Sequence, residues 1–80
     1  LPIFAFNLKD ADSTLGIDDV KAMSNKNAEI SFYDENGRIL LHTTIGRLTE
    51  ADMLSVGKGA RIVKINDGIH TYVNKYVINK

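Results

Sequence analysis

Hydrophobic and polar positions alternate most clearly between residues 28 and 45. Ala28, Ile30 and Phe32 take every second place, and Ile39, Leu41, Thr43 and Ile45 resume the pattern after the polar stretch 34–37. A period of two is typical of strands with one buried face, and Gly37 suits a turn that needs a positive φ. A loop of two or four residues keeps all the apolar positions on one face, whereas a loop of three divides them. We therefore expect a hairpin with a loop of two or four residues, and in the four-residue register His42 lies opposite Glu29.

A second hairpin is predicted from Arg61 to Val73. The sequence Asn66-Asp67-Gly68 suits a three-residue loop with glycine in the left-handed conformation. That register places Val63, Ile65, Ile69 and Val73 on one face, which we expect to be buried. It places Ile62, Lys64, His70 and Tyr72 on the opposite face.

A short helix is predicted between Thr49 and Gly57. Thr49 followed three residues later by Asp52 resembles a capping box. The segment 14–23 permits two interpretations. Ile17, Val20 and Met23 have helical spacing, but Gly16 interrupts a short segment, so a strand remains the alternative. The apolar residues 3–8 predict a further strand.

Length and composition indicate one small domain over residues 1–80. We expect a mainly β, α+β fold: a small antiparallel sheet of two hairpins with one or two short helices. The absence of cysteine excludes disulfides and thiol chemistry, and no apolar run is long enough to span a membrane. Ten basic residues balance ten acidic ones, but the acidic residues gather at 10–19 and 34–35, so one face could still be basic.

The sequence favours a non-enzymatic domain with no cofactor and no metal site. His42 and His70 lie on different predicted hairpins and lack the spacing of metal ligands. The closest approach to a nucleophile elbow, around Ser55, lacks its first glycine. A domain this small also offers little cleft for catalysis.

Lysine and asparagine residues interleave in the predicted turns and in the second hairpin. Such side chains can contact phosphates and base edges, although asparagine in turns and lysine on surfaces have ordinary structural roles as well. The candidate DNA-binding residues are Asn25, Lys26, Asn27, Lys64, Asn66, His70 and Lys75.

The order of segments resembles the LytTR family of bacterial DNA-binding domains. The resemblance is carried by Gly16-Ile17-Asp18-Asp19-Val20, by residues 30–37, by Ile45-Gly46-Arg47-Leu48 with Met53-Leu54, and by residues 63–68 and 72–78. It implies a cytoplasmic, sequence-specific DNA-binding domain of a transcriptional regulator that inserts loops into the major groove. The matching positions are the turn 25–27 and the region of Lys64, Asn66 and His70.

Two kinds of partner are therefore expected. The first is double-stranded DNA, bound by a monomer or a homodimer. The second is a protein, which would contact an exposed strand edge or a surface formed by Tyr33, Tyr72 and Tyr76. A single basic face favours DNA, whereas charges interspersed with apolar residues favour a protein.

Overall fold

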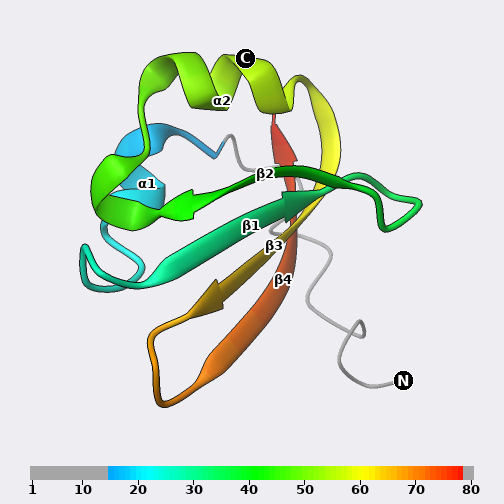
Figure 1. Cartoon of the computed structure of the whole chain (residues 1–80). Helices are drawn as coiled ribbons and strands as arrows, with labels where there is room; N and C mark the ends of the chain where they lie inside the picture. Colours follow the sequence, from blue (N-terminus) through cyan, green and yellow to red (C-terminus); the bar gives the residue numbers. More distant parts are fainter. Residues whose placement is uncertain (1–14, 79–80) are drawn as a thin grey trace.

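Two β-hairpins form one four-stranded antiparallel sheet with the strand order β2-β1-β3-β4 (Figure 1). The computed structural model describes residues 15–78. Its elements are α1 (Ile17–Lys21), β1 (Glu29–Tyr33), β2 (Ile39–Thr44), the 3-10 helix η3 (Ile45–Arg47), α2 (Glu50–Val56), β3 (Gly59–Asn66) and β4 (Thr71–Ile78). The predicted fold class is confirmed. The strand predicted at 3–8 lies outside the described residues.

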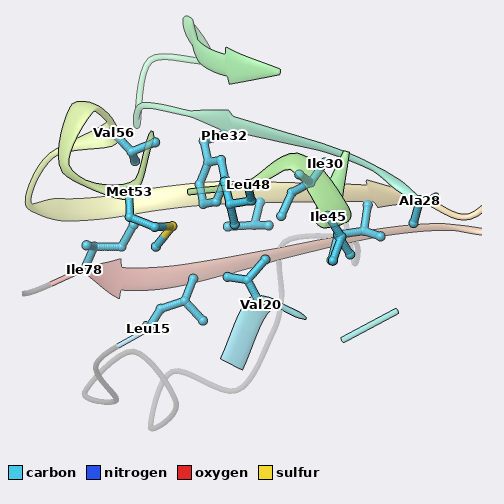
Figure 2. Packing of buried hydrophobic residues seen from close by; sticks show 12 residues of the cluster. Leu15, Val20, Ala28, Ile30, Phe32, Ile45, Leu48, Met53, Val56 and Ile78 are labelled. Carbon is cyan, nitrogen blue, oxygen red and sulfur yellow. The ribbon is translucent and has the colours of Figure 1, made fainter. Parts of the chain in front are cut away.

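The core lies between the helices and one face of the sheet (Figure 2). Val20 of α1, Ile45 of η3 and Met53 of α2 pack in the same buried cluster as Phe32 of β1 and Val63 of β3. The other members of the cluster are Leu15, Ala28, Ile30, Leu48, Val56, Ile65 and Ile78. Since all three helices contribute to this one cluster, the apolar positions of the central strands must face them.

Helix α2 begins as the sequence predicts. The Thr49 hydroxyl oxygen accepts a hydrogen bond from the Asp52 backbone N–H over 3.1 Å, and the Asp52 carboxylate accepts one from the Thr49 N–H over 3.0 Å. This reciprocal pair is the predicted capping box. A helix of seven residues is marginal alone, so Met53 and Val56 must hold it by packing in the core.

The ambiguous segment 14–23 contains a helix, and the strand interpretation is wrong. The Asp19 carboxylate accepts a hydrogen bond from the Gly16 N–H over 2.9 Å at the start of α1. At its end, the Lys21 ammonium donates to the Ile45 carbonyl over 2.9 Å. The first contact caps the N-terminus of this five-residue helix, and the second ties its last residue to η3.

The register of the first hairpin differs from the predicted one. Asp34 accepts hydrogen bonds from the Asn36 and Arg38 N–H groups, and its own N–H donates to the Arg38 carbonyl, which extends the loop to residues 34–38. A bulge follows, because Phe32 pairs with Leu41 while Tyr33 pairs with Ile39. Leu41 therefore shares the core face with Phe32, as predicted. The prediction that Ile39 also shares this face is wrong, because Ile39 pairs with Tyr33 and is 53% exposed.

The same register shift places His42 opposite Ser31. The prediction that His42 lies opposite Glu29 is wrong by two positions, because Glu29 pairs with Thr44. Residues two positions apart remain on one side of a strand, so Glu29 and His42 are still diagonal neighbours.

The second hairpin has a four-residue loop in place of the predicted three. Asn66 pairs with Thr71, and Gly68 has the expected positive φ of 95°. The Asp67 carboxylate accepts from the Ile69 and His70 N–H groups, which builds the longer turn. As a result Ile69 is 83% exposed at the tip of the hairpin, and the prediction that it is buried is wrong.

The longer turn also moves the side chains of β4 to the opposite faces of the sheet from those predicted. Val63 and Ile65 are buried as expected, but Tyr72 lies opposite Ile65 and faces the helices. Val73 lies opposite Lys64 on the other side of the sheet, where it is only half-buried. The prediction that Val73 shares a buried face with Ile65 is therefore wrong.

The side of the sheet opposite the helices is called the helix-free face below, since no helix among residues 15–78 packs on it. The pairing puts its residues in three rows across the sheet. The rows are Thr44, Glu29, Asn66 and Thr71; His42, Ser31, Lys64 and Val73; and Ile39, Tyr33, Ile62 and Lys75.

Candidate nucleic-acid interface

Four of the predicted DNA-binding residues lie on the β3–β4 hairpin. Lys64 and Lys75 face the helix-free side, since Lys64 lies opposite Ser31 and Lys75 opposite Ile62. Asn66 ends β3, and His70 lies in the turn that follows. The β3–β4 hairpin forms one side of the sheet, with β4 as the outer strand (Figure 1). One two-stranded ribbon thus collects lysine, asparagine and histidine side chains.

The turn 25–27 lies at the same end of the sheet as the tip of this hairpin. It leads into β1, whose first residue, Glu29, is paired with Asn66 at the end of β3. The Lys26 carbonyl accepts a hydrogen bond from the Gly46 N–H over 2.8 Å, which holds the turn against η3. The Lys26 side chain itself is exposed. The structure therefore brings both predicted loop regions to one end of the domain.

The asparagines in these loops also have the structural role that turn chemistry predicts. The Asn25 side-chain oxygen accepts from the Asn27 N–H over 2.9 Å, and that of Asn66 accepts from the Gly68 N–H over 2.8 Å. Each bond uses the amide oxygen and leaves the amide NH₂ group to donate elsewhere. The asparagine side chains are therefore already oriented by their own turns.

The tip of the β3–β4 hairpin exposes polar and apolar side chains next to one another. Ile69 is the most exposed large hydrophobic residue among residues 15–78. Beside it the rings of His70 and Tyr72 lie 6.1 Å apart at an angle of 37°. Asp67 lies in the same turn, and the N–H groups of His70 and Ile69 lower the pKa of its carboxyl group. One negative charge therefore accompanies the donors at this tip.

A hollow of about 180 Å³ lies in the middle of the helix-free face. The sequence did not indicate it, because its residues come from three strands and lack any motif spacing. The residues that line it are Glu29, Ser31, Tyr33, Ile39, His42, Lys64 and Asn66. Two of them, Lys64 and Asn66, were predicted as DNA contacts.

Ser31 and His42 are hydrogen-bonded inside this hollow. The Ser31 Oγ lies 2.8 Å from the His42 Nδ1, and the His42 Nε2 lies 3.7 Å from the Glu29 carboxylate. Ser31 is buried, whereas His42 and Glu29 are largely exposed. If Ser31 donates to Nδ1, the remaining ring proton is on Nε2 and faces the hollow.

The two histidines do not form a joint site. His42 lies on the outer strand β2, and His70 lies in the turn before β4, the outer strand on the other side of the sheet. In the described part of the chain no three His, Asp or Glu side chains are grouped in a way that could hold a metal ion. No helix between residues 15 and 78 has the length and apolar character needed to cross a membrane.

The three tyrosines do not form one surface, so that prediction is wrong. Tyr33 faces the helix-free side, because its neighbour Phe32 faces the core. Tyr72 and Tyr76 face the helices, where they line a second hollow of about 230 Å³ with Met23 and Asn74. The alternation along β1 and β4 accounts for the separation.

Comparison of the chain with protein-family models, with curated protein sequences and with solved structures gives no match. Function has to be inferred from the geometry of the chain itself.

Proposed function

We propose that this chain is a non-enzymatic DNA-binding domain of a bacterial, cytoplasmic regulator that contacts double-stranded DNA through the β3–β4 hairpin and the turn 25–27. The observation that carries the proposal is the position of Lys64, Asn66, His70 and Lys75 on one two-stranded ribbon at the side of the sheet. The major groove of B-DNA is wide enough to admit such a ribbon. The proposal agrees with the resemblance to the LytTR family.

The geometry suggests separate roles for these side chains. Lys26, Lys64 and Lys75 supply charge for phosphates, which sets affinity and not sequence preference. Asn66 and His70, at the end of the ribbon, supply donors for base edges. Ile69 at the tip offers an apolar contact of the kind that a thymine methyl group accepts.

A titration of labelled double-stranded DNA by fluorescence anisotropy at several salt concentrations tests the proposal. Three lysine–phosphate contacts predict a slope of log K against log salt of about −3. Lys64→Ala and Lys26→Ala should each make the slope less steep by about one. Lys58→Ala is the matched control, because Lys58 is exposed and precedes β3 at the opposite end of the sheet. The molecular mass of the complex shows whether one or two copies bind.

A protein partner is the second candidate, and a specific observation favours it. Glu29, Ile62 and Val73 lie among the lysines of the helix-free face, so its charges are interspersed with apolar side chains. Ile69 and Tyr72 are also exposed at the tip of the hairpin. Absence of DNA binding at low salt, or equal slopes for Lys58→Ala and Lys64→Ala, contradicts the DNA proposal and leaves this candidate.

A further inference from the structure

The hollow on the helix-free face has the size and the donors of a small-anion site. Its volume of about 180 Å³ is several times the roughly 30 Å³ that a water molecule occupies in the liquid. It therefore has room for a phosphate or carboxylate group. Three strands contribute to its lining, so its shape is set by the paired sheet and not by a loop.

Two donors in this hollow are unpaired within the part of the chain that the structure describes. Neither the Lys64 ammonium nor the Tyr33 hydroxyl has a hydrogen-bond or ion-pair partner among residues 15–78. A lysine ammonium has three donors and no acceptor, so it can only be satisfied by water or by an acceptor from outside. The position of Lys64 opposite Ser31 keeps it at the centre of the face.

Two further donors are oriented by bonds already in place. The Asn66 side-chain oxygen is held by the Gly68 N–H, so its amide NH₂ is the group that remains for a ligand. The hydrogen bond to Ser31 occupies Nδ1 of His42, so Nε2, 3.7 Å from the Glu29 carboxylate, is the ring nitrogen that remains for a ligand. Preorganised donors lose less freedom on binding than mobile ones, which favours affinity.

Among the described residues that line the hollow, Glu29 is the one that carries a negative charge and so opposes an anion. Its carboxylate lies 3.7 Å from the His42 Nε2 and is 62% exposed. It forms one side of the hollow, while Lys64 comes from the next strand, β3. A ligand oxyanion would therefore compete with Glu29 for His42.

We propose that the hollow formed by Ser31, Tyr33, His42, Lys64 and Asn66 binds a small oxyanion, that is, a phosphate or carboxylate group. The Lys64 ammonium supplies the charge, and Tyr33, Asn66 and the His42 Nε2 donate to the oxygens. Glu29 weakens the site at neutral pH. The inference does not depend on DNA binding, because the donors of the hollow can hold a free oxyanion when no nucleic acid is present.

Titration of the ¹⁵N-labelled protein with inorganic phosphate, followed by NMR at constant ionic strength, tests the inference. Saturable shifts should appear at the backbone amides of residues 31, 42 and 64. A parallel titration with acetate shows whether a carboxylate uses the same site, and one with a short DNA duplex shows whether a phosphodiester does. Lys64→Gln should raise the dissociation constant about tenfold or more, since the hydrogen bonds to the charged group are lost. Glu29→Gln should lower it.

Lys58→Gln is the matched control, because Lys58 is exposed, does not line the hollow and has no part in the proposed DNA contacts. Its dissociation constant should stay close to that of the wild type. The absence of saturable shifts in the wild type, or equal weakening in Lys64→Gln and Lys58→Gln, overturns the inference. Duplex binding without phosphate binding would overturn this inference alone. Phosphate binding without duplex binding would overturn only the proposed function.

Discussion

Gly46 and Lys26 are in unusually close contact. The Gly46 N–H donates to the Lys26 carbonyl over 2.8 Å, and a Cβ added at Gly46 would lie 3.0 Å from both the Cβ and the carbonyl oxygen of Lys26. Real Cβ atoms seldom come this near to backbone oxygen. Glycine at position 46 is what lets η3 hold the turn that carries one of the proposed phosphate contacts.

Gly46→Ala should therefore lower the free energy of unfolding by about 1–3 kcal/mol, because the added methyl group must displace the turn 25–27. Urea denaturation measures the change. Gly16→Ala provides the control, since its Cβ would meet its nearest neighbour, the Asp19 carboxylate, at an ordinary 3.5 Å. An equal loss in both variants would show that the close contact with Lys26 has no energetic importance.

Ile65 and Ile69 differ sharply in burial, and a matched pair of substitutions tests this difference. Ile65 is 5% exposed and Ile69 is 83% exposed. Ile65→Asp should unfold the domain or cost about 3 kcal/mol or more, because a charge would enter the core unpaired. Ile69→Asp should change stability by no more than about 0.5 kcal/mol. Thermal unfolding followed by circular dichroism compares them, and a stable Ile65→Asp variant would refute the register of β3.

Arg61 closes the C-terminal end of helix α2. Its guanidinium donates to the carbonyls of Val56, Lys58 and Ala60 over 3.0, 2.8 and 2.9 Å. The last carbonyls of a helix lack intrahelical donors, and a cation there also interacts favourably with the helix dipole.

Arg61→Met should lower the free energy of unfolding by about 1–3 kcal/mol. Arg61→Lys should recover little of the stability that Arg61→Met loses, because an ammonium cannot reproduce the planar arrangement of donors that reaches three carbonyls. Chemical denaturation of both variants is the measurement. Arg38→Met, on an exposed residue of the other hairpin, serves as the control and should be nearly neutral. Full recovery by lysine would show that charge alone is responsible.

Asp67 makes the second hairpin sensitive to acid. The backbone N–H of His70, followed by that of Ile69, lowers the pKa of its carboxyl group from the ordinary value of 3.8. A carboxyl group whose pKa is lower in the folded protein than in the unfolded chain stabilises the fold at pH values above its unfolded-state pKa. That contribution is lost as the pH falls below about 3.8 and through the folded pKa.

The urea midpoint of the wild type should therefore exceed that of Asp67→Asn at pH 5, and the difference should shrink as the pH falls to about 2. Asparagine retains a side-chain oxygen that can accept in the same turn, so the comparison isolates the charge. Asp34 has a lowered pKa for a similar reason, chiefly the Arg38 N–H, and contributes to the same acid sensitivity. A difference between wild type and Asp67→Asn that stays constant over this range would contradict the assignment.

The local sequence determined much of the fold. The alternation at 28–32 and the apolar Val63 and Ile65 placed β1 and β3 and their buried faces, because a period of two is a property of the strand itself. Thr49 and Asp52 identified the start of α2, because a capping box lies within four consecutive residues. Turns of this kind need a residue with positive φ, which accounts for the glycines at positions 37 and 68.

Cross-strand neighbours were decided only when the strands paired, and the lengths of the two turns set those pairings. Asp34 and Asp67 each recruit backbone N–H groups that lengthen their turns, and a change of one or more residues in a loop moves every following side chain relative to its partner strand. That is why Ile69 is exposed and why His42 meets Ser31. The hollow on the helix-free face combines residues of β1, β2 and β3, whose proximity depends on the strand order. The sequence could name Lys64 and Asn66 as candidates, but only the paired sheet could place them beside Ser31, Tyr33 and His42.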